Sequence, residues 1–258
     1  MKIGIHITTH NRQVFTDQCL KSFYMSEPLH TKLVIVDNAS SDNTQEVLKT
    51  HHSKFEKYIH CIVYNAQNLH LGAAVRQGWN ILKEDYDILG WINNDFLFEP
   101  GWESNLLACF SDLNLDYAVG WMLPEREKTR IVTESKKGFY VPKNDVGAAY
   151  FLLTKHFLNG VAPSPRPFGN KYVGPGPSFH KLLIKRKLRG IRLASPGILV
   201  RSSEYTNPDY HEYYNETFGI RGRPEQLKKF RRNEVKGDFR GGLNWQQFQD
   251  KYYTKGKV

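Results

Sequence analysis

Four polar segments in the first hundred residues each follow a short apolar run, and their residue types suit the binding of a nucleotide and a cation. The segments are residues 8–12 (TTHNR), 37–44 (DNASSDNT), 68–78 (NLHLGAAVRQG) and 93–95 (NND). The carboxylate of Asp37 can accept hydrogen bonds from a ribose or from a base N–H. Asp95 is a hard oxygen ligand suited to a divalent cation that bridges phosphates. We therefore expect these segments to form one ligand site together.

Each segment also has an ordinary structural interpretation. An Asp at the end of a strand is commonly a turn former or a helix cap. The small residues of 68–78 do not form the GxGxxG dinucleotide fingerprint. The order of the segments and their placement, more than any single motif, favour a functional site.

Strands and helices that alternate along the chain must position these segments. Apolar runs predict buried parallel strands over residues 3–8, 32–36, 59–64 and 88–92. Helical spacing predicts helices over residues 14–25, 44–51, 73–83 and 102–113. This alternation implies βαβ units and an α/β fold with a mostly parallel sheet. Ligands bind at the carboxyl ends of the strands in such sheets, which is where all four segments fall.

The pattern loosens after residue 123. There the sequence predicts a loop or hairpin over 124–143, a strand over 146–154, an ordered loop over 162–177, a basic helix over 179–189, a strand over 192–201, and a helix over 224–235 that Pro224 opens. The chain shows neither an internal repeat nor a low-complexity segment.

The composition indicates a water-soluble protein. Of the 258 residues 40% are hydrophobic, and the mean hydropathy is −0.55. No stretch approaches the ~20 apolar residues that span a bilayer, and the N-terminus lacks the features of a signal peptide. Cys19, Cys61 and Cys109 lie far apart without CxxC spacing, as expected of reduced thiols. We therefore expect a cytoplasmic protein.

The net charge of +10 is concentrated at one end of the chain. Residues 1–180 contain equal numbers of basic and acidic side chains, so the whole excess lies in residues 181–258. A neutral body with a basic end suggests a polyanionic partner such as nucleic acid, anionic lipid or a phosphorylated acceptor. The alternative is a solvated basic face that only promotes solubility.

The motif order THNR, VIVDNASSDNT, NLHLGAAVRQG and WINNDFLFEPGW resembles family 2 glycosyltransferases and their GT-A relatives. The resemblance covers roughly the first 155 residues and is closest to the rhamnosyltransferase-like branch, with its VDNAS-D-T motif and LN-x-D version of DxD. It implies a GT-A fold: a Rossmann-like, mostly parallel sheet flanked by helices, with a basic C-terminal extension. We expect a catalytic domain over 1–203, with a nucleotide-sugar half (1–120) and an acceptor half (121–203). An extension or lid over 204–258 follows.

The resemblance assigns roles to single residues. Thr9 and Arg12 would lie beside the nucleotide base, Asp37 would bind base or ribose, Asn93 would face the sugar or ribose, and Asp95 would hold Mn²⁺ or Mg²⁺ against the diphosphate. The expected donor-binding set is Thr9, Arg12, Asp37, Asn38, Arg76, Asn93 and Asn94.

The chain departs from the family pattern in its donor loop and in its metal ligands. His70 stands where relatives usually carry Gly, and Arg76 where they often carry Asn. Arg76 would add charge near a phosphate or lie on an exposed helix surface. A late metal-binding His is not obvious, and His211 and Glu204 are nearby substitutes.

The catalytic base is a further departure. Inverting relatives carry an acidic pair where this chain reads YVGPGPSF over residues 172–179. Asp145 is the first candidate for the general base, with Glu204, Asp209 and His180 behind it. The interpretation of Asp145 as a turn residue within residues 143–145 is the favoured one. Without a base a retaining reaction is possible, so the stereochemical outcome stays open.

The C-terminal region combines aromatic rings with a short basic helix that carries Lys228, Lys229, Arg231 and Arg232. These residues would neutralise phosphates of a polyanionic acceptor, or the region would form a lid over the donor site with its charges in water.

The leading hypothesis is a metal-dependent transfer of a hexose, deoxyhexose or pentose from a nucleoside diphosphate sugar to an acceptor hydroxyl. The acceptor would be hydroxymethylated phage DNA in an infected host, or a glycan or lipid-linked intermediate of surface polysaccharide synthesis. A non-catalytic GT-A-like module that binds nucleotide-sugar or polyanion is the alternative of another class, and a nucleotidyltransferase is a weaker one.

Overall fold

The structure is a computed structural model that describes residues 1–112, 114–120, 149–165, 176–193, 198–200 and 245–253. The chain divides into two units. The first consists of Met1–Trp121 and Thr129–Ile198, and the second of Met122–Lys128 and Leu199–Val258. The predicted hairpin over 124–143 and the predicted helix over 224–235 lie outside the described residues.

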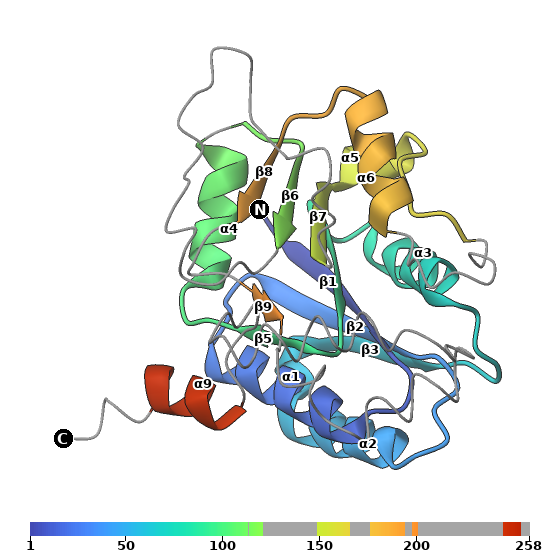
Figure 1. The fold of residues 1–258 in the computed structure, drawn as a ribbon, viewed down its shortest axis with the longest axis vertical. Helices are drawn as coiled ribbons and strands as arrows, with labels where there is room; N and C mark the ends of the chain where they lie inside the picture. Colours follow the sequence, from blue (N-terminus) through green and yellow to red (C-terminus); the bar gives the residue numbers. More distant parts are fainter. Residues whose placement is uncertain (113, 121–148, 166–175, 194–197, 201–244, 254–258) are drawn as a thin grey trace, which may run out of the picture. The chain divides into compact units, whose positions relative to one another are not determined.

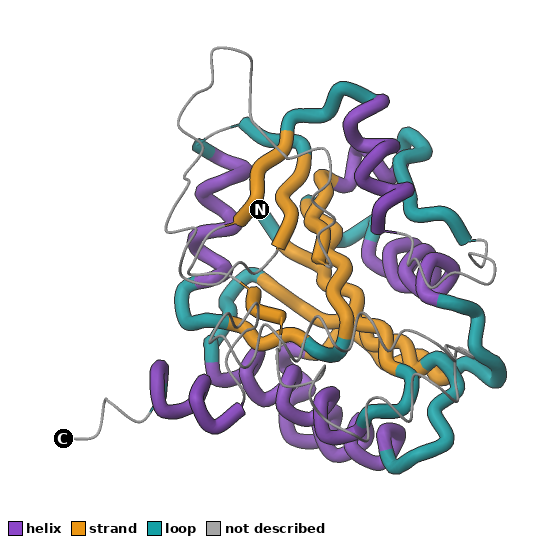
Figure 2. Tube along the Cα trace, in the orientation of Figure 1, coloured by secondary structure: helices purple, strands orange, loops and turns teal. Residues whose placement is uncertain are grey.

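The first unit is a layer of strands with helices on both faces (Figures 1 and 2). The described strands are β1 (Ile3–Thr9), β2 (Thr31–Asp37), β3 (Ile59–Tyr64), β4 (Ile88–Asn93), β5 (Phe96–Phe98), β6 (Tyr117–Gly120), β7 (Ala149–Leu153), β8 (Gly190–Leu193) and, across the boundary of the units, β9 (Ile198–Val200). The helices are α1 (Gln13–Met25), α2 (Thr44–Phe55), the 3₁₀ turn η1 (Glu56–Tyr58), α3 (Leu71–Leu82), α4 (Trp102–Ser111), α5 (Thr154–Leu158) and α6 (Gly176–Lys185).

The main sheet has seven described strands in the order β3-β2-β1-β4-β7-β6-β8. Strand β1 pairs in parallel with both β2 and β4, and β2 pairs in parallel with β3. Only β7 runs against its neighbours β4 and β6 in this sheet as described. The sheet is therefore mixed but mostly parallel, which confirms the predicted α/β class.

The alternation of side chains along β1 assigns the two faces of the sheet. His6 faces α3, because a Cβ added to Gly78 of that helix would lie 2.2 Å from Nδ1 of His6. Ile3, Ile5 and Ile7 therefore face the opposite side, where Figure 1 shows α1 and α2. Both faces of β1 are buried, as expected for a central parallel strand, and the buried residues include the polar His6, Thr8 and Thr9.

Aromatic side chains fill the core on the α3 side. Trp91 of β4 stacks on Tyr150 of β7 with ring centroids 5.3 Å apart, and Phe179 of α6 meets Tyr150 edge-on at 5.2 Å. The indole N–H of Trp79 donates to the carbonyl of Gly90 at 2.8 Å, so this buried polar group is satisfied. This packing attaches α3 and α6 to strands that come from distant parts of the sequence.

The opposite core is built around Phe23 of α1. Its ring meets Phe98 at 5.0 Å and Tyr58 at 5.8 Å. Trp102 packs on Phe98 at 5.0 Å and donates its indole N–H to Ser26 Oγ at 2.9 Å. The short strand β5 and helix α4, which follow the NND segment, are thereby held against α1.

The predicted elements agree with the structure best before residue 113. The predicted strand over 146–154 is described as β7 from Ala149, and Thr154 instead starts α5. The predicted basic helix begins earlier, at Gly176, and ends at Lys185. The predicted strand over 192–201 is described only as the end of β8 and as β9. Strands β5 and β6 were not predicted.

The second unit is described mainly by helix α9 (Trp245–Tyr252), which was also not predicted. Within it Trp245 stacks on Phe248 at 6.1 Å, and Lys251 lies 4.9 Å from the ring centroid of Tyr252. Among the described helices of both units, none has the length and apolar character that a membrane crossing requires.

Candidate active site

The parallel register brings the predicted polar segments to one edge of the sheet. Thr9 at the end of β1 lies opposite Asp37 at the end of β2. Thr8 lies opposite Asn93 at the end of β4. The segments that follow these three strands therefore meet at the carboxyl edge, as expected for a ligand site in an open α/β sheet.

Asp37 is fully buried, and the chain itself supplies its hydrogen-bond donors. Thr9 Oγ1 donates to Oδ1 at 3.1 Å, and Gln45 Nε2 donates to Oδ2 at 2.8 Å. The backbone N–H of Ser40 donates to Oδ2 at 3.3 Å, and its hydroxyl donates to Oδ1. Asp37 thus organises the loop after β2, and a ligand donor reaches this carboxylate only by replacing one of these groups.

Asn38 joins three of the segments. Its Nδ2 donates to Asn68 Oδ1 at 2.7 Å, and its Oδ1 accepts the backbone N–H of Leu69 at 2.9 Å. Asn65 Nδ2 donates to the same Oδ1 at 3.3 Å. His10 Nδ1 contacts the Asn38 carbonyl oxygen at 2.9 Å. Asn38 is buried, so its amide holds the loops together.

Arg12 and Asp95 form an ion pair, with Arg12 Nη2 at 3.3 Å from Asp95 Oδ2. Arg12 Nη1 also donates to Asn94 Oδ1 at 3.4 Å. The side chains of Arg12 and Asp95 are each 12% exposed. The sequence placed both residues in the site, but it did not predict that they contact each other.

Two side-chain oxygens of the 93–95 segment remain unpaired within the part of the chain that the structure describes. Asp95 Oδ1 and Asn93 Oδ1 are buried, and neither has a hydrogen-bond partner among the described residues. The amide of the intervening Asn94 is held instead, since its Nδ2 donates to Thr16 Oγ1 at 2.9 Å. Buried unpaired oxygens are costly unless a ligand satisfies them, and carboxylate and amide oxygens are suitable ligands for Mg²⁺ and Mn²⁺. The residues present therefore fit a divalent cation.

Arg76 of α3 anchors a neighbouring segment. Its Nε donates to the carbonyl oxygen of Pro163 at 2.6 Å. One turn earlier in α3, Gly72 approaches the same segment so closely that an added Cβ would lie 1.8 Å from the carbonyl oxygen of Ser164. Arg76 is half-buried, so its helix face is not fully exposed to solvent.

Several residues of the site edge have left-handed backbone conformations. Asn11 has φ 55° and Arg12 φ 69°, in the loop after β1. Ala39 has φ 64°, in the loop after β2. His70, at the N-terminus of α3, combines φ 64° with ψ 160°, a region used almost only by Gly. Asn and His adopt positive φ more often than most residue types, whereas Arg and Ala give no such signal.

The remaining predicted site residues lie outside the described residues: Asp145, Glu204, His211, Lys228, Lys229, Arg231 and Arg232. His180 is described, and its buried ring faces Tyr117 at the start of β6. Because β6 runs parallel to β8 and against β7, Tyr117 lies near the amino edge of the sheet. His180 is thus distant from the edge that carries Asp95. Within the described ranges no three His, Cys, Asp or Glu side chains gather into a metal cluster.

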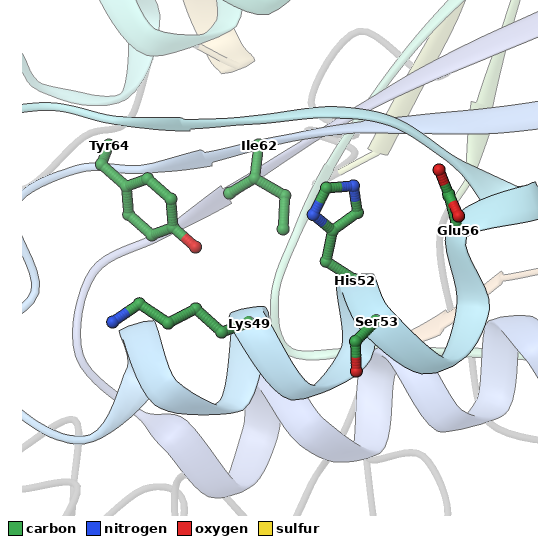
Figure 3. Close-up of a pocket in the computed structure, with 6 residues that line it drawn as sticks. All are labelled: Lys49, His52, Ser53, Glu56, Ile62 and Tyr64. Carbon is green, nitrogen blue, oxygen red and sulfur yellow. The ribbon is translucent and has the colours of Figure 1, made fainter.

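A shallow hollow lies beside the edge strand, between α2 and β3 (Figure 3). It is lined by Lys49, His52, Ser53, Glu56, Ile62 and Tyr64. None of these is a predicted site residue. Tyr64 lies opposite Asp37 in the register, so the hollow begins next to the site edge but extends away from Asp95.

Comparison with known proteins identifies a family over the part of the chain that contains the polar segments. The family model described as Glycosyl transferase family 2 matches residues 4–163, which include all four polar segments. A search of curated proteins gives no match.

Solved structures share the fold. The mannosyltransferase PcManGT from Pyrobaculum calidifontis, in complex with GDP-Man and Mn²⁺, is similar over 91% of this chain and 69% of its own, with TM-score 0.66 and 12% identity. S. aureus TarS 1–349, in complex with UDP-GlcNAc, is similar over 96% of this chain and 70% of its own, with TM-score 0.62 and 10% identity. At such identities the likeness shows the fold alone, and it confirms the GT-A architecture.

Proposed function

Because the chain belongs to glycosyl transferase family 2 and is thus a nucleotide-sugar glycosyltransferase, we propose that it transfers one hexose, deoxyhexose or pentose to an acceptor hydroxyl with the help of Mn²⁺ or Mg²⁺ at Asp95. The observation that supports this proposal is the pair of buried oxygens, Asp95 Oδ1 and Asn93 Oδ1, that lack hydrogen-bond partners among the described residues. Within the family, the motifs favour the rhamnosyltransferase-like branch.

In this proposal Asp95 holds the cation and Asn93 accepts a hydrogen bond from the donor's sugar or ribose. When bound, the cation neutralises the charge that develops on the departing diphosphate. The complex of PcManGT with GDP-Man and Mn²⁺ supports such a donor and cation for a protein of this fold. Thr9 and Arg12 position the base, and the buried Asp37 keeps the loop after β2 in shape for it.

For the acceptor side we propose Asp145 or Glu204 as the group that takes the hydroxyl proton, with His211 as a second cation ligand. The acceptor we favour is hydroxymethylated DNA, held at Lys228, Lys229, Arg231 and Arg232. The observation behind it is the charge of +10, all of it in residues 181–258. A glycan or lipid-linked acceptor is the alternative if these side chains only face water.

The donor is tested by thermal shift with UDP-, GDP-, dTDP- and CMP-sugars, each with and without Mn²⁺. The right donor raises the melting temperature by mass action, and more so with the cation. Slow release of the nucleotide from that donor then reports turnover. A protein that binds a donor but never releases nucleotide from it, with any acceptor, is a binding module.

The Asp95→Asn variant tests the cation site. We expect nucleotide release to fall by about 100-fold or more, because the carboxylate that holds the cation is lost. The matched control is Asp85→Asn, which removes an exposed carboxylate at the other end of β4. If Asp95→Asn retains the activity of the control, the proposed role of Asp95 is wrong.

A further inference from the structure

Asp95 already has a cation beside it: the guanidinium of Arg12. Arg12 Nη2 lies 3.3 Å from Asp95 Oδ2, and Nη1 lies 3.4 Å from Asn94 Oδ1. Each nitrogen contacts a different acceptor, so the pair lacks the bidentate geometry of the strongest Arg–carboxylate contacts. Arg12 is therefore held at Asp95 by long contacts.

The backbone of Arg12 is fixed although its side-chain contacts are long. Its carbonyl oxygen accepts the N–H groups of Phe15 at 3.0 Å and of Thr16 at 3.1 Å, which begins α1. Thr16 also holds Asn94 independently through its hydroxyl, at 2.9 Å. The guanidinium also lies 5.0 Å from the ring centroid of Phe15. Rotation about side-chain bonds can move it away from Asp95 while the backbone of the loop and Asn94 stay in place.

A metal ion bound at Asp95 Oδ1 would lie close to the guanidinium on Oδ2, and two cations at such short range in a site of low dielectric repel each other. The side chain of Asp95 is only 12% exposed, so water screens this repulsion weakly. The anionic diphosphate of a donor would offer Arg12 a second partner in the same site, in place of the contact with the base that the family resemblance implies.

We propose that Arg12 neutralises Asp95 in the donor-free enzyme and thereby opposes the divalent cation, so that the cation binds tightly only when a donor diphosphate draws the guanidinium away from Asp95. This inference rests on the proposed function, since it assumes that the cation binds at Asp95. It makes Arg12 a positioning residue that orders binding: donor and cation enter together, and a cation alone binds poorly.

The test measures Mn²⁺ affinity by calorimetry or by the electron paramagnetic resonance signal of free Mn²⁺, without turnover. The variants are Arg12→Gln, which keeps the length but removes the charge, and Arg12→Lys, which keeps the charge. Lys21→Gln is the matched control, because it removes one positive charge from the exposed face of α1. Each protein is titrated with Mn²⁺ alone, with Mn²⁺ and UDP, and with Mn²⁺ and GDP.

We expect Arg12→Gln to bind Mn²⁺ alone about tenfold or more tightly than the wild type, because the substitution removes a positive charge next to the cation site. Arg12→Lys and Lys21→Gln should resemble the wild type. The gain in Mn²⁺ affinity on adding UDP or GDP should shrink in Arg12→Gln. Equal Mn²⁺ affinities for Arg12→Gln and the wild type, in folded proteins with unchanged melting temperatures, overturn the inference.

Asp95→Asn separates this inference from the proposed function. If Asp95→Asn abolishes the nucleotide-dependent Mn²⁺ binding while Arg12→Gln changes nothing, the cation site stands and only the role of Arg12 is wrong. If Asp95→Asn binds Mn²⁺ with UDP or GDP as well as the wild type, the cation site itself is wrong and the inference fails with it.

Discussion

His70 is the clearest case of a single residue in an unfavourable conformation. Its φ of 64° and ψ of 160° lie in a region that L side chains rarely adopt, and its side chain is exposed. Resemblance to the family places Gly at this position. The strain lies at the start of α3, where the third polar segment leads into the helix. It lowers the stability of the fold, and the exposed side chain of His70 adds no buried contact in return.

We predict that His70→Gly raises the free energy of unfolding by about 1 kcal/mol, since the relief of backbone strain exceeds the added entropy of the unfolded chain. Urea denaturation measures it. The control is His52→Gly, an exposed His in the last turn of α2, where Gly should cost up to about 1 kcal/mol. A loss of stability in both variants contradicts the strain argument.

His6 makes the stability of the protein depend on pH. It is fully buried, its Nε2 shares a hydrogen bond of 2.6 Å with Thr8 Oγ1, and its Nδ1 has no partner among the described residues. Burial lowers the pKa of His6 from 6.5 to about 3. Below pH 6.5 the unfolded chain therefore binds a proton that the native state cannot bind until about pH 3.

We predict that His6 lowers the free energy of unfolding by about 1.4 kcal/mol for each pH unit as the pH falls from 6.5 towards 3. Urea denaturation between pH 7.5 and 5 measures this slope. His51, whose pKa burial also lowers, adds to it. The His6→Asn variant should show a shallower slope, and an unchanged slope would show that other groups control the acid sensitivity.

At the scale of elements, Glu103 connects α4 to the start of β2. Its Oε1 accepts the hydroxyl of Thr31 at 2.6 Å and the N–H of His30 at 2.9 Å. Its Oε2 accepts the N–H of Leu29 at 2.8 Å. Glu103 is buried, so one carboxylate satisfies three donors in a place with little water. This contact fixes where β2 begins.

We predict that Glu103→Ala lowers the free energy of unfolding by about 2–4 kcal/mol, because it leaves these donors unpaired. The control is Glu46→Ala, which breaks the exposed pair with Lys49 and should cost less than about 1 kcal/mol. Equal effects of the two substitutions, measured by thermal or urea unfolding, would show that Glu103 is not a structural anchor.

At the scale of the whole molecule, the asymmetry of charge distinguishes residues 1–180 from the C-terminal region. The chain carries 36 basic and 26 acidic residues, and the excess lies in residues 181–258. Retention on DNA or heparin reports a polyanion-binding surface, because the affinity for a polyanion falls as salt is added. The slope of log affinity against log salt concentration is proportional to the number of phosphates that the protein neutralises.

We predict that replacing Lys228, Lys229, Arg231 and Arg232 by Gln weakens retention on DNA and lowers the slope of log affinity against log salt by about 3. A variant with Lys21, Lys32, Lys49 and Lys57 replaced by Gln loses the same charge from the exposed surface of the body. If both variants elute together, the basic region is a solvated face and a glycan or lipid-linked acceptor becomes the better hypothesis.

The periodicity of apolar and polar residues sufficed to predict the parallel strands β1 to β4 of the sheet. Apolar runs such as residues 3–8 and 88–92 require burial on both faces, and helical spacing between them requires crossovers, so the polar segments had to meet at one edge. β7 shows where this argument ends. Its apolar run predicted a strand, but strand direction does not show in side-chain alternation, so only the structure revealed that β7 is antiparallel to β4.

The structure alone decided which site residues meet. Arg12 and Asp95 are 83 positions apart, and local spacing carries no information about a contact of that separation. The conformation of His70, with φ 64° and ψ 160°, does not show in its residue type either, since only Gly is characteristic of that region. Residue types and order therefore determine which edge of the sheet carries the polar segments, whereas the pairings of charges and the strain at that edge depend on how distant loops pack.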